Sequence, residues 1–257
     1  MAYSMGPGKI VEDGLVFYVD GANKVSYPGS GTNINNLIDN NLSGSINGAT
    51  YSTSNVGVFD FDGVDDSIGL NSQFLSSFQS NIDASNAFSV SFWIKTSNTT
   101  SQQLVFGNQG NSWNQYETTW LQVSGSSNGG YIMFSVMTDP DSAPHDYSRI
   151  QNNLTTNSIN DNNWHHVCCT IGVDSSTTYL VSKAYIDGTL VKTVLATPQG
   201  SYRQEIDIIN NDYYIGARGS NSIQGFEGEI SNLNLYIKEL SSQEVFQNYN
   251  ALKGRFV

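Results

Sequence analysis

The densest group of acidic side chains in the sequence is the segment 60–66 (DFDGVDD). It carries Asp60, Asp62, Asp65 and Asp66. Calcium prefers carboxylate and carbonyl oxygens, and loops supply both. The spacing is not that of an EF-hand loop, and Asp and Gly also favour tight turns without a metal. We therefore predict calcium as the candidate cofactor here, with a plain turn as the alternative.

A second segment combines aromatic rings with amide side chains. It contains Trp113, Tyr116 and Trp120, together with Asn111 and Asn114. Aromatic rings stack on the apolar faces of sugars, while amides exchange hydrogen bonds with hydroxyl groups. We predict these residues as a carbohydrate-binding site; the alternative is that they cover the edge of the fold.

Two pairs of adjacent residues also carry groups that could do chemistry: His165 with His166, and Cys168 with Cys169. On a strand, neighbouring side chains point to opposite faces, so the histidines cannot chelate one ion together. Neighbouring cysteines rarely meet the geometry of a disulfide. We expect two free thiols, packing for one histidine and exposure for the other.

The overall charge excludes some partners. The chain has 257 residues and a formal net charge of −12, with 11 Lys and Arg. A nucleic-acid binder needs clustered cations to neutralise phosphate, and anionic membrane surfaces repel an acidic protein. We expect neither nucleic acid nor membrane as a partner, and no stretch is apolar over transmembrane length.

Alternating apolar residues indicate the elements that must position these groups. Segment 87–96 (AFSVSFWIKT) places Phe88, Val90, Phe92 and Ile94 on one face and Trp93 on the other, the period of a strand. Further strands are predicted at 14–20, 57–61, 67–70, 103–107, 120–123, 130–137, 164–173, 178–186, 190–196, 213–217 and 226–237.

One helix is predicted, at residues 242–252, because apolar residues recur there at three- and four-residue spacing after a serine cap. The segment 21–47 reads as a long irregular loop. Many strands with a late helix predict an all-β fold, a jelly-roll sandwich of two antiparallel sheets with one short C-terminal helix. We expect a flexible arm at residues 1–11 and one jelly-roll domain at 12–257.

A catalytic site is not expected. The segment 205–210 (EIDIIN) places Glu205 and Asp207 like the first two acids of laminarinase-like glycosidases on this kind of scaffold. Retaining hydrolysis needs a second carboxyl about 5 Å from the first, and Asn210 or Asn211 stands in its place. An amide cannot donate a proton at neutral pH. We therefore predict a protein that is not an enzyme.

An ordered set of segments resembles the laminin G-like, concanavalin A-like lectin/glucanase superfamily. They are 14–29 (GLVFYVDGANKVSYPG), 59–66 (FDFDGVDD), 88–94 (FSVSFWI), 163–166 (NWHH), 185–188 (YIDG), 214–216 (YIG) and 226–252. The opening at 10–29 and the ending at 244–256 (EVFQNYNALKGRF) are similar to virion proteins of tailed, marine bacteriophages. Relatives often carry Asp where Ser231 stands, which weakens the calcium prediction.

The resemblance implies a non-enzymatic virion structural protein, a capsid decoration or a tail or fibre appendage. Its expected partners are other virion proteins and host-surface glycans, with assembly in the host bacterial cytoplasm and a homo-oligomer as a further expectation. Two alternatives stay open: a stand-alone carbohydrate-binding module and, with less support, a glycoside hydrolase.

Overall fold

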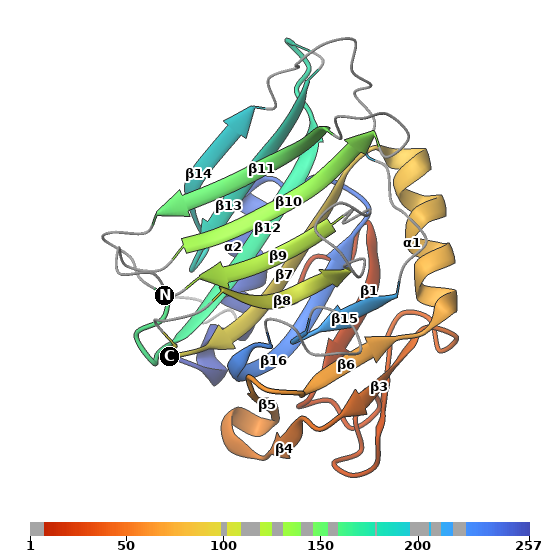
Figure 1. Cartoon of the computed structure of the whole chain (residues 1–257), viewed down its shortest axis with the longest axis vertical. Helices are drawn as coiled ribbons and strands as arrows, with labels where there is room; N and C mark the ends of the chain where they lie inside the picture. Colours follow the sequence, from red (N-terminus) through yellow and green to blue (C-terminus); the bar gives the residue numbers. More distant parts are fainter. Residues whose placement is uncertain are drawn as a thin grey trace, which may run out of the picture.

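Two antiparallel sheets face each other in this protein and enclose the main core (Figure 1). The computed structural model describes residues 8–98, 102–108, 119–124, 131–139, 146–153, 159–177, 179–195, 206, 212–217 and 225–257. The predicted all-β sandwich with a C-terminal helix is confirmed, and every predicted strand overlaps an observed one. Among the described residues, no helix is both long and apolar enough to cross a membrane.

The first layer, sheet A, follows the order β14–β13–β12–β7–β16–β5–β4 in the described residues, and β1 pairs with the later part of β16. Its strands are β1 (Leu15–Asp20), β4 (Thr50–Ser52), β5 (Val58–Asp62), β7 (Phe88–Lys95), β12 (Trp164–Val173), β13 (Leu180–Ile186), β14 (Thr189–Leu195) and β16 (Glu227–Tyr236).

The second layer, sheet B, follows the order β11–β10–β9–β8–β15–β6–β3–β2 over the described parts. Its strands are β2 (Asn33–Asn35), β3 (Ser43–Asn47), β6 (Ser67–Leu70), β8 (Gln102–Asn108), β9 (Thr119–Ser124), β10 (Tyr131–Asp139), β11 (Asp146–Asn153) and β15 (Tyr213–Ile215). The segment 21–47 was expected to be irregular, but it contributes β2 and β3.

Strand β7 shows how the core forms. Phe88, Val90, Phe92 and Ile94 belong to the core between the sheets, while Trp93 joins a separate cluster on the other face of sheet A. The alternation read from the sequence is therefore confirmed. The adjacent cysteines of β12 divide in the same way. Cys169 lies in the main core, Cys168 lies in a second cluster, and both are free thiols.

A helix that the sequence analysis missed closes one side of the core. Helix α1 (Ser72–Ser85) begins at Asn71, whose side chain accepts a hydrogen bond from the Phe74 backbone N–H. Its buried residues Phe74, Phe78 and Ile82 recur every four positions and enter the main core. That spacing is a helical signal, but Ser, Gln and Asn fill most of the intervening positions and weaken it.

Helix α2 (Ser242–Leu252) and the short 3-10 turn η2 (Lys253–Arg255) cover the other face of sheet A. A capping box between Ser241 and Glu244 fixes the start of α2. The Phe256 ring then stacks on Trp93, with ring centroids 4.4 Å apart. Val11, at the end of the segment predicted as an arm, is buried and donates its backbone N–H to Asn248.

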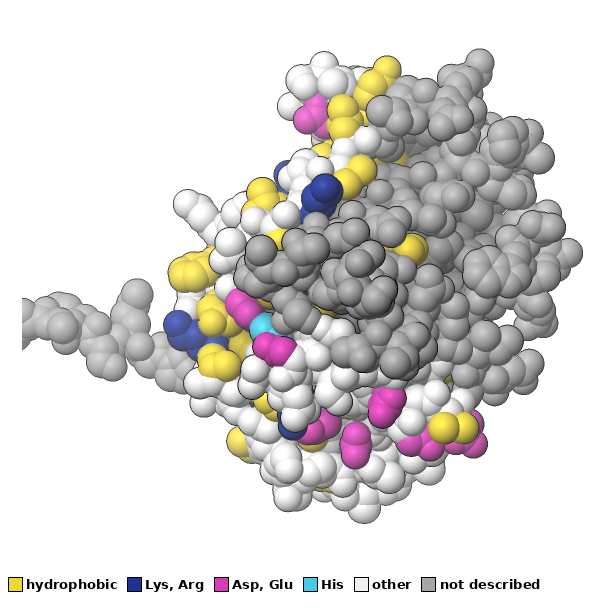
Figure 2. Space-filling model, turned by 60° about the vertical axis from the view of Figure 1, so that its left-hand side comes forward, with side chains coloured by type: hydrophobic (Ala, Val, Ile, Leu, Met, Phe, Trp, Pro, Cys, Tyr) yellow, Lys and Arg dark blue, Asp and Glu magenta, His cyan; other side chains and the backbone are white. Residues whose placement is uncertain are grey.

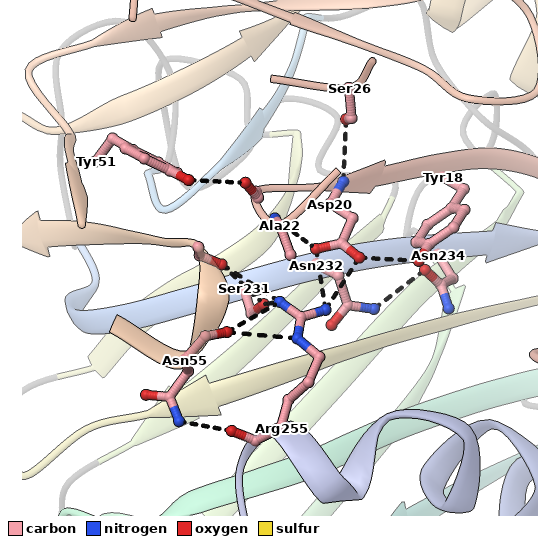
Figure 3. Close-up of polar contacts among 12 residues, drawn as sticks. Tyr18, Asp20, Ala22, Ser26, Tyr51, Asn55, Ser231, Asn232, Asn234 and Arg255 are labelled. Carbon is pink, nitrogen blue, oxygen red and sulfur yellow. Dashed lines mark hydrogen bonds and ion pairs between the residues drawn. The ribbon is translucent and has the colours of Figure 1, made fainter. Parts of the chain in front are cut away.

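An ion pair with a buried carboxylate and a partly buried guanidinium fixes this C-terminal segment to the sheet (Figure 3). Nη1 of Arg255 lies 3.1 and 3.0 Å from the two carboxylate oxygens of Asp20, on β1. Nη2 of Arg255 donates to the Ser231 hydroxyl at 2.8 Å, and the Asn55 side chain donates to the Arg255 carbonyl. The guanidinium also donates to the Asn55 carbonyl at 3.4 Å, so it joins β1, β16 and the 3-10 turn η1 (Ser54–Val56).

We predict that Arg255→Gln lowers the free energy of unfolding by about 3 kcal/mol, because it leaves the buried Asp20 carboxylate without its cation. Chemical denaturation monitored by tryptophan fluorescence measures the loss. Lys192→Gln, on the exposed strand β14, is the charge-matched control and should change stability by no more than about 0.5 kcal/mol. Equal losses in the two variants would contradict a special role for Arg255.

Candidate functional site

One end of sheet A carries a row of charged residues on the face turned away from sheet B. Asp60 on β5 is the cross-strand partner of Glu229 on β16, and Glu229 is the partner of Lys95 on β7. The core side chains Phe61, Ile94 and Ile230 come next along these strands, so the charged groups point the opposite way. The Lys95 ammonium lies 2.9 Å from the Glu229 carboxylate.

This row forms one side of an open hollow with a cavity volume of about 340 Å³. Its lining residues are Asp60, Phe61, Asp62, Lys95, Thr96, Ser97, Asn162, Glu227, Gly228 and Glu229. Gly228 is required by the geometry. It has a φ of +142°, and a Cβ atom there would lie 2.2 Å from the Lys95 carbonyl oxygen. The start of β16 can therefore approach β7 closely.

Hydrogen bonds hold the wall formed by residues 96–98. The buried Thr96 donates its hydroxyl to the Glu227 carbonyl at 2.7 Å and accepts the Asn98 backbone N–H. The Asn98 amide donates to the Glu227 carboxylate at 2.6 Å. Asn162 completes this side by donating its backbone N–H to the Thr96 carbonyl at 3.0 Å. The wall is thus assembled from segments distant in sequence.

The hollow is strongly acidic. Burial raises the pKa of Asp60, the neighbouring Glu229 carboxylate raises it further, and Lys95 partly opposes both. Of the lining residues, Asp60, Asp62, Glu227 and Glu229 carry carboxylates and Lys95 alone carries an ammonium group. Such a site can accept hydrogen bonds from hydroxyl groups and attracts cationic groups.

The predicted acidic turn lies beside the hollow. Asp62, Asp65 and Asp66 bring one carboxylate oxygen each to within 4.8 Å of one another. Asp62 accepts the backbone N–H groups of Val64 and Asp65, and Asp66 accepts that of Asp62. These bonds are those of a tight turn, which is itself a sufficient reason for Asp at these positions. Asp60, the fourth predicted ligand, instead faces Glu229.

The carboxylates of the acidic turn repel one another, and the pKa of Asp66 reflects this repulsion. Burial raises the pKa of its carboxyl, the Asp62 backbone N–H lowers it, and the carboxylates of Asp62, Asp65 and Asp60 raise it again. The net direction is upward. A divalent cation would relieve this repulsion, and the oxygen ligands present are those calcium prefers. Calcium therefore remains a prediction at Asp62, Asp65 and Asp66.

The predicted aromatic site cannot be located. Trp113, Tyr116, Asn111 and Asn114 lie outside the described residues, as do Glu205, Asp207, Asn210 and Asn211. Trp120 belongs to β9, where its cross-strand partners are Ser135 and Gly107. The carbohydrate prediction for this segment therefore stays a prediction.

The two histidines have different surroundings at the same end of the molecule. His166 is buried beside Trp93, and burial lowers its pKa to about 4. His165 is half-buried and lies between Asp161 and Asp187. Figure 2 shows acidic side chains gathered on this face around a histidine. Sequence reasoning missed this arrangement. Asp187 and Gly188, between β13 and β14, both have positive φ, as a two-residue hairpin turn requires.

Comparison with known proteins identifies the family. A family model described as the concanavalin A-like lectin/glucanases superfamily matches residues 62–246, more than half of the chain. The chain belongs to this superfamily. A search of curated protein sequences gave no match.

Solved structures show the same fold. The receptor-binding domain of botulinum neurotoxin C/D mosaic serotype aligns with a TM-score of 0.64 and 16% identity over 93% of this chain and 51% of that one. A structure of botulinum neurotoxin type C, whose cell entry is dependent upon interaction with two ganglioside molecules, aligns with a TM-score of 0.58 and 15% identity over 93% of this chain and 51% of that one. The chain therefore spans about half the length of these toxin domains.

A domain of similar size also matches this concanavalin A-like chain. Domain 4 of AbnA, an extracellular arabinanase from Geobacillus stearothermophilus, was solved in complex with arabinotriose. It aligns with a TM-score of 0.57 and 20% identity over 91% of this chain and 98% of that domain. At identities this low, the likeness shows a shared fold.

The calcium prediction can be tested by thermal unfolding in a chelator and in millimolar calcium. We expect calcium to raise Tm by about 2–4 °C, because a ligand that binds only the folded state stabilises it. Asp65→Asn should abolish the rise, whereas Glu12→Gln, at an exposed position outside the turn, should retain it. A wild-type Tm that does not change with calcium would contradict the prediction.

Proposed function

We propose that this chain is a non-enzymatic structural protein of a bacteriophage virion, and that it binds host-surface glycans in the acidic hollow at the end of sheet A. The observation that carries the glycan part is the hollow itself, an open depression walled by hydrogen-bonding side chains on a lectin-type fold. Its volume of about 340 Å³ lies in the range of small-molecule sites.

The polar groups of the hollow suit a saccharide. Carboxylates of Asp60, Glu227 and Glu229 accept hydrogen bonds from sugar hydroxyls, and charge makes such bonds about twice as strong as neutral ones. Lys95 and the Asn162 amide are donors for ring and hydroxyl oxygens. A sugar hydroxyl both donates and accepts, so it can use both kinds of group.

The charge of the hollow selects among saccharides. Four carboxylates face one ammonium group, so a carboxylated, sulfated or phosphorylated sugar would be repelled. Neutral and amino sugars are therefore the proposed ligands. This differs from the botulinum neurotoxin DC binding domain, which was solved in complex with SialylT.

The virion part of the proposal is supported by the resemblance of the opening segment 10–29 and the ending 244–256 to phage virion proteins. Within the described residues, Val11 packs on the same face of sheet A as α2 and donates its backbone N–H to the α2 residue Asn248. We propose other virion proteins as partners, assembly in the host cytoplasm and a capsid or tail position on the particle.

A stand-alone carbohydrate-binding module is the second candidate. It is favoured by the alignment with domain 4 of AbnA, because this chain covers 98% of a domain that was solved with a bound oligosaccharide. This candidate shares the proposed glycan site and differs only in the absence of a particle. Glycoside hydrolysis is not proposed, because Asn stands where the second catalytic carboxyl would be needed at 210 or 211.

We predict that the purified protein binds neutral or amino saccharides, with arabinotriose as the first probe and a glycan array as the wider screen. Glu229→Gln and Asp60→Asn should each weaken binding about tenfold in calorimetry, since each replaces a charged acceptor by a neutral one. Glu12→Gln, an exposed acid away from the hollow, should bind like wild type. Binding restricted to sialylated or sulfated glycans would overturn the charge argument.

The virion proposal predicts that the protein co-purifies with particles. Mass spectrometry and immunogold labelling of particles from a culture producing the chain should find it at fixed stoichiometry on the capsid or tail. If the particles lack the protein while saccharide binding persists, the stand-alone binding module would be the better description.

A further inference from the structure

The ring of His165 bridges two carboxylates from different segments. Nδ1 lies 2.8 Å from Oδ2 of Asp187, in the turn between β13 and β14. Nε2 lies 3.2 Å from Oδ1 of Asp161, in the segment before β12. Both contacts are within hydrogen-bonding distance, and the side chain is 15% exposed.

A position between two carboxylates favours the protonated form of the His165 ring. Neutral imidazole carries one N–H, so it can donate to one carboxylate while its other nitrogen presents a lone pair. Imidazolium carries two N–H groups and can donate to both. Burial alone would lower the pKa of His165, but the hydrogen bonds and charges of Asp187 and Asp161 outweigh it and the pKa is raised.

The two contacts are not equally anchored. Asp187 accepts the His166 backbone N–H at 2.9 Å and donates its own N–H to the His166 carbonyl. Asp161 is held by Asn163 of its own segment, and its contact with His165 is the longer one. Of the two contacts, the one with Asp161 is therefore the one we expect a neutral His165 to give up.

The Asp161 segment also forms a wall of the hollow. Asn162, its next residue, lines the hollow and donates its backbone N–H to Thr96. On the other side of Asp161, the Asn160 amide donates to the Asn98 carbonyl at 3.3 Å, and Asn98 bonds the Glu227 carboxylate. Any displacement of Asp161 therefore reaches the groups proposed to bind saccharide.

We propose that His165 is a positioning residue that acts as a pH-operated latch. As an imidazolium it holds segment 160–163 against residues 96–98 and keeps the hollow in its binding shape. As a neutral ring it releases segment 160–163. The saccharide part of this inference rests on the proposed function. The movement of the wall does not.

The titratable groups next to His165 do not change their charge over the pH range in which His165 does. His166 points to the other face, beside Trp93, and stays neutral above its pKa of about 4. Burial raises the pKa of the Tyr249 phenol, on α2, and the Asp187 carboxylate raises it further, so Tyr249 stays neutral too. The pKa of Asp161 is lowered, since its hydrogen bonds outweigh burial, so it stays charged throughout the range.

Nuclear magnetic resonance on the full chain tests the latch without any ligand. The His165 ring resonances are followed from pH 5.5 to 8.5, together with the exchange rate of the Asn162 amide proton corrected for intrinsic base catalysis. We expect exchange to accelerate about tenfold as His165 deprotonates. His165→Gln, which is never charged, should show fast exchange at every pH, and Glu12→Gln should follow wild type.

Asp161→Asn provides a second variant in case His165→Gln does not fold. It should lower the His165 pKa and remove the step in Asn162 exchange. A titrating His165 with a flat Asn162 exchange profile in the wild type would overturn the latch, and so would an unchanged step in Asp161→Asn.

Saccharide binding at pH 6 and pH 8.5, with arabinotriose or the strongest glycan from the array, separates the two proposals. About fivefold weaker binding at the higher pH, absent in Asp161→Asn, supports the latch acting on the site. Equal affinity at both values overturns the action of the latch on the site and leaves the proposed function intact. Exchange that steps while no glycan binds at either pH supports the latch and overturns the glycan function.

Discussion

The ion pair between Arg255 and Asp20 determines which surfaces of sheet A are available. It fixes the end of the chain across β1 and β16, and the aromatic residues around it seal the face that sheet B does not cover. As a result β7, at the centre of sheet A, is buried on both faces for nearly its whole length. The exception is Lys95, its last residue. A ligand that reaches β7 must therefore approach the end of this strand, where the acidic hollow lies.

This placement also explains how so many carboxylates are tolerated together. At the strand ends, most of these groups keep contact with water, which screens their repulsion. Where exposure falls, a cation is supplied locally. Lys95 pairs with Glu229, and His165 lies between Asp161 and Asp187. Asp60 and Asp66 form no ion pair within the described residues. Burial and neighbouring carboxylates raise the pKa of both, and Lys95 opposes this only in part at Asp60.

The sequence predicts what depends on local pattern and misses what depends on register. The alternation in β7 and the opposite fates of Cys168 and Cys169 follow from the period of a strand alone. Helix α1 was missed because polar residues separate Phe74, Phe78 and Ile82, and burial in the core overrides that weak signal.

The hollow was missed for a different reason. Asp60, Lys95, Asn162 and Glu229 come from four distant segments, and only the pairing of β5, β16 and β7 makes them neighbours. The acidic turn was found because its members are adjacent in sequence. Its assignment to calcium could not be decided from the sequence, since a tight turn and an ion site favour the same residues.

The adjacent histidines show how one strand can carry opposite responses to pH. The contribution of His165 to stability is present below the ordinary histidine pKa of about 6.5 and is lost as pH rises through its raised pKa. That of His166 is present above about 6.5 and is lost as pH falls towards about 4, because its buried ring must remain neutral. Mild acid thus strengthens the contacts of His165 while it weakens the packing under α2. Since the first effect acts at the segment beside the hollow and the second in the Trp93 cluster under α2, global stability and the shape of the hollow need not change together with pH.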